Sequence, residues 1–225
     1  MLEALIKSFP MAMGIALSPA PILAIIMLLM TKRAKISAPL FLLGWILGLQ
    51  IVGVIIILMS GVIADHGGMS DATGTVKIIA GIVLLLLIIP IWIKKKKQEG
   101  KEKIPKLFNN LDEFGVIKVF IIGFTFSALS FKNVALSASG AAHIHTTSLV
   151  DYFETLIGVF LFSIIASFTI ILPILIYFLA PNKIEILLLK WRSWLIKYNK
   201  DILMSMLLIA GIMLVSIGIK IHFIN

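Results

Sequence analysis

Six long apolar runs constrain this 225-residue chain more than any other feature. A helix that crosses a bilayer needs about 20 mainly apolar residues. Each run is long enough for one crossing, and the connections between the runs leave no room for a separate soluble domain. The runs cover residues 9–30, 38–63, 76–93, 117–142, 152–180 and 202–220. The sequence therefore predicts an all-α membrane protein with six transmembrane helices.

Composition and charge agree with this prediction. Hydrophobic residues make up 60% of the chain and its mean hydropathy is +1.10, whereas soluble domains are about half apolar. A net charge of +9 would suggest a nucleic-acid partner in a soluble protein, but here the basic residues fall between the apolar runs. We therefore expect membrane lipids as the surroundings and no nucleic acid as a partner. The absence of cysteine excludes disulfides and thiolate metal sites.

Basic residues gather in alternate connections, and such connections face the cytoplasm in multi-pass proteins. They are Lys32, Arg33 and Lys35, then Lys94, Lys95, Lys96, Lys97, Lys101, Lys103 and Lys106, then Lys183, Lys190, Arg192, Lys197 and Lys200. The other two connections carry mainly acidic residues and histidines, namely Asp65, His66 and Asp71, then His143, His145, Asp151 and Glu154. This alternation predicts that both termini lie outside.

The longest polar stretch falls at the middle of the chain and divides it into two halves. We predict a first three-helix repeat at 1–93, a basic cytoplasmic linker at 94–116 and a second three-helix repeat at 117–225. Three crossings per half make the second half enter the membrane inverted, as in many secondary transporters. A faint internal similarity supports two repeats, because Ala80-Gly81-Ile82 of the third run recurs as Ala210-Gly211-Ile212 in the sixth.

The segment 181–198 precedes the sixth run and mixes apolar with basic side chains. An amphipathic helix at the cytoplasmic interface would place its basic residues against anionic lipid headgroups. A loop anchored at the interface by Trp191 and Trp194 is the alternative.

Two of the runs contain breaks at comparable depth. The break residues are Ser18, Pro19 and Pro21 in the first run and Ser130, Lys132 and Asn133 in the fourth. Each proline removes a backbone donor and displaces the carbonyl four residues earlier. In hydrocarbon, non-helical backbone is tolerated where it lines a polar cavity or packs against protein. We predict that helices 1 and 4 are broken near the midplane and that the break residues bind the substrate; packed kinks are the alternative.

Lys132 is the strongest single indication of function. A lysine near the centre of a span costs about 2.5–3.5 kcal/mol on insertion scales, so it should face a cavity or a partner. Its ammonium suits a carboxylate or phosphate. No acidic residue lies near the middle of a run, so the expected partner is an anionic substrate group, backbone carbonyls or water. A lysine that reaches the interface is the alternative.

Other residues carry weaker signals. His143 and His145 are compatible with an external metal site or a pH-sensitive gate, but solvated loop residues are the favoured interpretation, and we predict no metal site. Gly44, Gly48 and Gly53 permit close helix contact within one chain or in a homodimer. The sequence has no catalytic triad spacing, zinc-protease motif, Walker motif or dinucleotide glycine pattern. We therefore expect no enzymatic activity, no catalytic residues and no cofactor.

Short motifs in both halves resemble one family. The stretch from Gly14 to Ile22, followed by Lys32-Arg33-Ala34 and by Phe41 to Trp45, resembles the GAP family of bacterial and archaeal membrane proteins. That family includes the sulfolipid-addressing Sap proteins and is grouped with the lysine-exporter superfamily. The stretch from Phe131 to Leu136 is similar to the family's Asn-Pro-Lys-Asn-Leu motif, with Ser130-Phe131 in place of Asn-Pro.

The resemblance implies a six-helix, exporter-like fold in a prokaryotic cytoplasmic membrane. It carries over residue by residue only at Pro19, Pro21, Lys132 and Asn133. Substrates in the group range from amino acids and metal ions to envelope glycolipids, so it implies no particular substrate.

Two hypotheses of function follow. The first is a secondary transporter that exports a small or amphipathic anionic substrate, such as an envelope lipid or glycolipid, by alternating access. The alternative is a non-transporting scaffold that assists envelope lipid synthesis or export through the basic 94–106 loop and the 181–198 segment. An intramembrane enzyme that uses metal at His143 and His145 is disfavoured.

Overall fold

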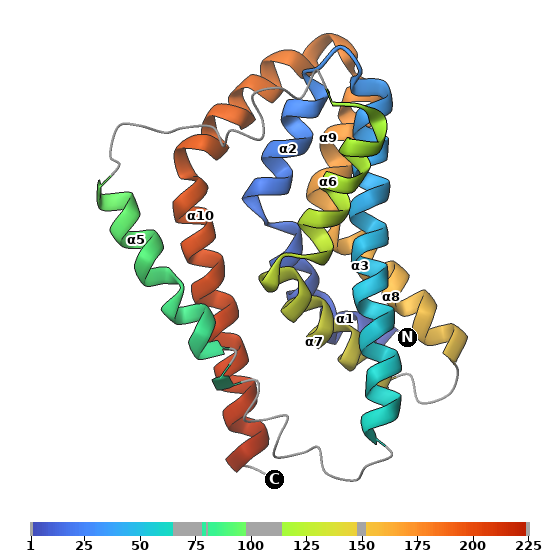
Figure 1. Cartoon of the computed structure of the whole chain (residues 1–225), viewed down its shortest axis with the longest axis vertical. Helices are drawn as coiled ribbons and strands as arrows, with labels where there is room; N and C mark the ends of the chain where they lie inside the picture. Colours follow the sequence, from blue (N-terminus) through green and yellow to red (C-terminus); the bar gives the residue numbers. More distant parts are fainter. Residues whose placement is uncertain (1, 65–77, 80, 98–113, 148–151, 224–225) are drawn as a thin grey trace. The chain divides into compact units, whose positions relative to one another are not determined.

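The computed structural model describes residues 2–64, 78–79, 81–97, 114–147 and 152–223, and within these ranges the regular structure is helical with no strand (Figure 1). The helices are α1 (Leu2–Ala16), α2 (Pro19–Leu29), α3 (Ala34–Ala64), α5 (Ile88–Lys97), α6 (Val116–Ala128), α7 (Phe131–Thr147), α8 (Tyr152–Ala166), α9 (Phe168–Leu179) and α10 (Pro181–Phe223). The predicted all-α class is confirmed.

Contacts divide the chain into two compact units. The first comprises Met1–Met59 and Ile104–Ile196, and the second Ser60–Lys103 and Lys197–Asn225. The first unit therefore holds α1, α2, α6, α7, α8 and α9, most of α3 and the beginning of α10. All six predicted site residues lie in it. The repeat boundaries expected from the sequence stay predictions, and most of the basic linker lies outside the described residues.

Two helices contain a stretch that is long and apolar enough to cross a membrane alone, Ala34–Leu58 in α3 and Lys200–Lys220 in α10. Three helix pairs reach that length only together, and they are bent: α1–α2 by 60°, α6–α7 by 64° and α8–α9 by 64°. The third predicted run forms a shorter apolar helix at Gly81–Ile93. The described residues thus give two candidate spans, or five if each bent pair is one span. This establishes a multi-pass character, and the sixth span stays a prediction.

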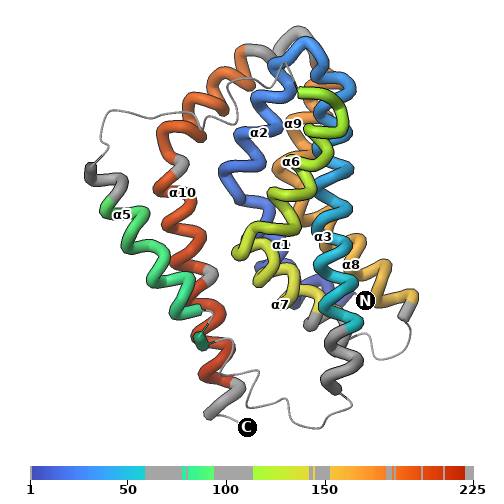
Figure 2. Tube along the Cα trace, viewed as in Figure 1, coloured from blue at the N-terminus to red at the C-terminus, as the bar shows by residue number. Residues whose placement is uncertain are grey.

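The turn between α1 and α2 follows from Pro19 and Pro21. Both lie in the first turn of α2, where backbone N–H groups have no intrahelical acceptor, so the missing donors cost little. The preceding residue, Ser18, is extended with φ −67° and ψ 115°, as expected before a proline. Figure 2 shows the chain turning at this point. The predicted break in the first run is confirmed.

The turn between α6 and α7 forms without a proline. α6 ends at Ala128 and α7 begins at Phe131, so Lys132 and Asn133 stand in the first turn of α7. The Asn133 side chain donates from Nδ2 to the carbonyl oxygen of Phe126 at 2.9 Å, and thereby satisfies one carbonyl at the end of α6. The predicted break in the fourth run is confirmed. The bond from the Asn133 amide to the Phe126 carbonyl joins the two sides of this turn.

A third bend, between α8 and α9 at Ser167, was not predicted, because the fifth run reads as an uninterrupted helix. Pro173 cannot donate to the carbonyl four residues earlier. Ser163 and Ser167 donate their hydroxyls back to the carbonyls of Val159 and Ser163, at 2.9 and 2.6 Å. Back-bonding of this kind bends helices, so the two serines account for the bend, whereas Pro173 acts beyond it, inside α9.

Glycines let α3 and α6 touch at their backbones. A Cβ atom on Gly44 would collide with the carbonyl oxygen of Phe120, and one on Gly123 with that of Phe41. Gly48 lies against Ser127 in the same crossing. The glycines of α3 therefore serve contact within the chain, and the homodimer that they also permitted stays a prediction. Another face of α3 exposes large apolar side chains, namely Leu43, Leu47, Ile51, Ile55 and Leu58.

In the second unit, the central glycines of the two similar tripeptides, Gly81 and Gly211, lie against each other. A Cβ atom on Gly81 would lie 2.8 Å from the carbonyl oxygen of Gly211, and one on Gly211 would lie 3.1 Å from that of Gly81. The two backbones are therefore close enough that a larger residue at either position would push them apart.

The segment 181–198 forms the beginning of α10, so the loop alternative is wrong. Ile184, Leu188 and Leu195 are buried, whereas Ile186 and Trp194 are exposed. One face of this segment is therefore buried and the other exposed. Its location at a membrane interface stays a prediction.

Candidate functional site

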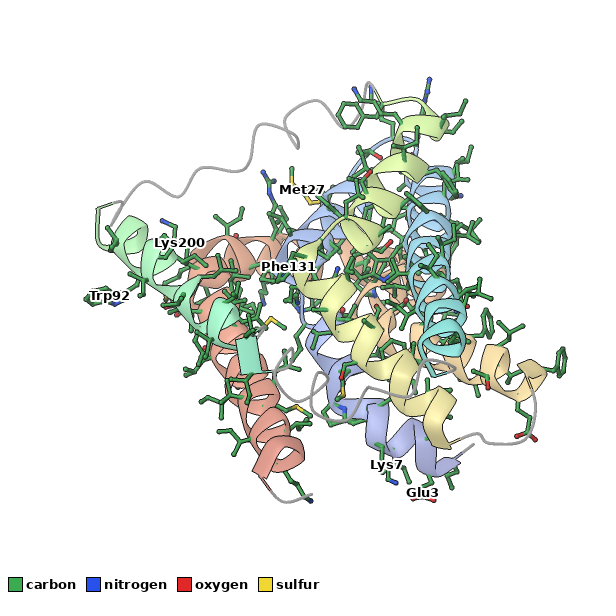
Figure 3. The ribbon with its side chains drawn as sticks, turned by 60° about the horizontal axis from the view of Figure 1, so that its bottom comes forward. Glu3, Lys7, Met27, Trp92, Phe131 and Lys200 are labelled. Atoms are coloured by element: carbon green, nitrogen blue, oxygen red, sulfur yellow. The ribbon has the colours of Figure 1, made fainter. Side chains whose placement is uncertain are left out.

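The ammonium of Lys132 joins the two predicted breaks. Its Nζ donates to the carbonyl oxygen of Gly14 at 2.8 Å and to Ser18 Oγ at 2.7 Å. Lys132 lies in the first turn of α7, which begins at Phe131 (Figure 3). Gly14 and Ser18 lie at the end of α1 and in the turn that follows. Residues more than a hundred positions apart thus meet at one charged group.

The carbonyl of Gly14 is available because α1 ends there. In a continuing helix, the N–H of Ser18 would donate to it, but that N–H instead donates to the carbonyl of Ile15 at 3.1 Å. A carbonyl left unpaired in a low-dielectric interior is costly. The lysine therefore satisfies a backbone group that the break exposes.

Two neighbouring carbonyls of the same turn are satisfied by hydroxyls. In a continuing helix, residue 19 would donate its N–H to the carbonyl of Ile15, but Pro19 has none. The Ile15 oxygen instead accepts from Ser18 Oγ at 2.7 Å. The oxygen of Ala16 accepts from the hydroxyl of Thr169, in the first turn of α9. The third bend therefore contacts the first, which agrees with the packing of α1 on α8 and of α2 on α9.

Asn133 completes the junction between the breaks. Its Oδ1 lies 3.4 Å from Ser18 Oγ. The single proton of the Ser18 hydroxyl has a much nearer acceptor in the Ile15 carbonyl, so the contact with Asn133 is the weaker one. Ser18 and Asn133 are only 5% and 2% exposed, so this polar cluster is held inside the first unit.

The six predicted site residues divide into three groups. Ser18, Lys132 and Asn133 come together through their side chains. Pro19 and Pro21 are buried in α2 and shape the backbone. Ser130 contributes its carbonyl, which accepts the N–H of Val134 at 2.9 Å.

The sequence did not identify Gly14 and Thr169 as site residues. Gly14 contributes only a backbone oxygen, and Thr169 lies in a run that reads as continuous. A count of four residues back from Ser18 would have marked the carbonyl of Gly14 as unpaired.

The cluster has an excess of positive charge. An ammonium carries three donors, and two of them are used by neutral oxygens, those of Gly14 and Ser18. Among the described residues, Lys132 has no carboxylate partner; the ion pair of α1 lies at Glu3 and Lys7, which are 2.8 Å apart. The site can therefore accept an anionic group through the remaining donor of Lys132.

Gln50, another polar residue within an apolar run, serves to hold two helices together. Its Nε2 donates to the carbonyl of Val159 at 3.1 Å and to Ser163 Oγ at 2.8 Å, and so ties α3 to α8 just before the third bend.

The two histidines expected in an outer connection belong to α7, so their placement in a loop was wrong. The described part of the chain contains no group of three or more histidine or acidic residues that could hold a metal ion. Asp65, His66, Asp71 and Asp151 lie outside the described residues.

A helical, strongly apolar chain with three bent helix pairs defines a multi-pass membrane protein with a broken-helix site. The first two turns meet at one partly buried ammonium, and the third contacts the first through Thr169 and the carbonyl of Ala16. A family model described as "Sap, sulfolipid-1-addressing protein" matches residues 9–220. Because the match covers almost the whole chain, the protein belongs to this family. Neither the curated proteins nor the solved structures contain a significant match.

Proposed function

We propose that this protein is a secondary transporter of a prokaryotic cytoplasmic membrane, and that it exports an anionic amphipathic substrate such as an envelope lipid or glycolipid. The observation that carries the proposal is the bond between Lys132 of one broken pair and Gly14 of the other. A cation at the junction of two broken helices is suited to hold a substrate group that must pass between them.

The proposal includes six spans arranged as two inverted repeats. A pseudo-twofold axis brings equivalent residues of the two halves together. Two observations support such an axis: the first break meets the second through Ser18 and Lys132 in the first unit, and Gly81 meets Gly211 in the second unit.

The anionic character of the substrate follows from the charge of the site. Binding a neutral group would leave the ammonium of Lys132 without a counter-charge in a low-dielectric region, whereas an anion neutralises it. The family's description names a sulfolipid, and this supports an anionic lipid as the substrate class.

Buried hydroxyls on α7 support a polar pathway next to the cluster. Ser137 Oγ and Ser139 Oγ are buried and have no hydrogen-bond partner among the described residues. Buried hydroxyls are nearly always paired, so water or the polar part of a substrate would supply the missing partners. In this mechanism the protein performs no catalysis and uses no nucleotide; the breaks open alternately to the two sides of the membrane.

Cysteine accessibility tests the proposal directly, because the chain contains no native cysteine. Single cysteines are placed at Ser18 and Ser130, and at Leu47 on the exposed apolar face of α3 as a control. A membrane-impermeant thiol reagent is applied to intact cells and to inverted vesicles. We expect reaction at Ser18 and Ser130 from at least one side, no reaction at Leu47, and altered access when Lys132→Ala is added.

If neither Ser18→Cys nor Ser130→Cys reacts from either side, the breaks are packed kinks. The scaffold hypothesis then replaces the transporter.

A further inference from the structure

We propose that the carboxyl end of α1 is a binding site for a monovalent cation and that the ammonium of Lys132 is its tethered occupant. The transporter would then carry its own cation where other broken-helix transporters bind a metal ion. The consequence for transport rests on the proposed function, whereas the site itself does not.

The first argument is the set of ligands. The ammonium is held by one backbone carbonyl and one hydroxyl, Gly14 O at 2.8 Å and Ser18 Oγ at 2.7 Å. Both oxygens are neutral, and both belong to a single helix end. Backbone carbonyls at unwound positions and the carboxyl ends of half-helices coordinate sodium ions in secondary transporters, and the hydroxyl of Ser18 adds a second neutral oxygen.

The second argument is electrostatic. The carboxyl end of a helix carries the negative end of its dipole and favours a cation. The last turn of α1 contains no basic residue of its own. The positive charge reaches it from α7 instead, through a side chain long enough to cross between the two breaks.

The third argument is the position of Lys132 at the amino end of α7. There the helix dipole is positive, so the ammonium lies between a helix end that attracts it and one that repels it. This arrangement favours a bond to α1 over a return to its own helix. A tethered ammonium cannot diffuse away, so the end of α1 needs no sodium ion at any stage.

The experiment removes the tether and supplies the cation from solution. Lys132→Ala deletes a fragment that matches n-propylammonium, and Lys132→Met fills the same space with a neutral chain. The purified full chain is unfolded by heat in detergent, and tryptophan fluorescence gives Tm. We expect both variants to have a lower Tm than the native chain. Addition of n-propylammonium chloride should restore most of the loss in Lys132→Ala alone.

Three controls define the result. n-Propanol at the same concentration should not raise the Tm of Lys132→Ala. Choline chloride, the control for ionic strength, should not raise it either. Lys35→Ala should retain the native Tm because Lys35 is exposed. Lys132→Ala combined with Ser18→Ala should lose the response, because one of the two oxygens is gone. Absence of recovery in Lys132→Ala, or equal recovery in Lys132→Met, would overturn the proposal.

If Lys132→Ala does not fold, Lys132→Cys provides a second route in this otherwise cysteine-free chain. Alkylation of the new thiol with 2-bromoethylammonium gives a lysine isostere, and alkylation with 2-bromoethanol gives a neutral chain of equal length. Recovery of Tm with the ammonium alone supports the site, and equal recovery with both reagents contradicts it.

The same variants separate this inference from the proposed function. Transport by the native chain should not require sodium. If n-propylammonium restores Tm but no transport is detected in the native chain, the cation site stands and the transporter hypothesis fails. If transport is present but Tm does not respond, the site is wrong and the transporter stands.

Discussion

Ser18 serves two groups with one hydroxyl. It accepts from Lys132 Nζ and donates to the carbonyl of Ile15. Ser18→Ala removes both bonds and leaves a buried carbonyl without its side-chain donor. We expect a loss of about 1–3 kcal/mol in the free energy of unfolding, together with slower transport. Thermal unfolding in detergent measures the first, and substrate efflux from reconstituted vesicles measures the second.

A matched control for this change is Ser216→Ala. Ser216 also donates to a carbonyl of its own helix, Met213 O at 2.9 Å, but it is exposed on α10. We expect less than about 0.5 kcal/mol for this change. Equal losses in both variants would show that the bond between Ser18 and Lys132 adds nothing to stability beyond the bond of a serine hydroxyl to a carbonyl of its own helix.

Thr169 connects the third bend to the first, since its hydroxyl donates to the carbonyl of Ala16. Thr169→Val keeps the shape and removes the donor, so we expect a loss of about 1–3 kcal/mol from the unpaired carbonyl. Thr169→Ser keeps the hydroxyl and should retain most of the native stability. Urea or heat unfolding of the two variants compares them. A greater loss in Thr169→Ser than in Thr169→Val would mean that the methyl group, and not the bond, is what matters.

At the scale of helices, the α3–α6 crossing depends on the absence of side chains. A Cβ atom on Gly44 would meet the backbone oxygen of Phe120, which cannot move unless the whole helix moves. Gly44→Ala gains up to about 1 kcal/mol of helix propensity. We still expect a net loss of about 1–3 kcal/mol from overpacking, measured as a lower Tm.

The control is Gly115→Ala, at the amino end of α6, where a Cβ atom would meet nothing within 4 Å. Alanine is a poorer N-cap than glycine, but φ at Gly115 is −64°, so the lower entropy of the unfolded chain offsets part of that cost; we expect a loss of less than about 1 kcal/mol. If Gly44→Ala is as harmless as Gly115→Ala, the two helices do not pack as closely as the structure has them.

The helices show what could be predicted from the sequence and what could not. The first two breaks were predictable, because prolines or polar residues interrupt apolar runs at Ser18–Pro21 and at Ser130–Asn133. The third was not, since Pro173 and two serines leave the hydropathy of the fifth run high. Backbone contacts leave no signal in side-chain chemistry. For this reason backbone carbonyls were only one of three kinds of partner expected for Lys132, beside an anionic substrate group and water, and the partner of Gly44 could not be predicted.

At the scale of the whole chain, the number of crossings decides where the termini lie. An even number puts both termini on one side of the membrane, and an odd number puts them on opposite sides. The described residues give up to five candidate spans. Of the third apolar run, predicted at 76–93, they contain only a shorter apolar helix, Gly81–Ile93. The six-span prediction and the inverted repeat therefore depend on whether that run crosses the membrane.

The basic connections predict that both termini lie outside. Single cysteines at Lys7 and Lys220 report on the two ends, and one at Lys35, in the first turn of α3, reports on the cytoplasmic side; all three positions are exposed. Lys7 pairs with Glu3 on one helix face (Figure 3), and such an exposed pair contributes little to stability. In intact cells, we expect an impermeant maleimide to label Lys7→Cys and Lys220→Cys, and Lys35→Cys only after permeabilisation. Labelling of Lys7→Cys without Lys220→Cys would mean an odd number of crossings, and the inverted repeat would fall. Protection of both ends with labelling of Lys35→Cys would keep an even number of crossings and reverse their orientation.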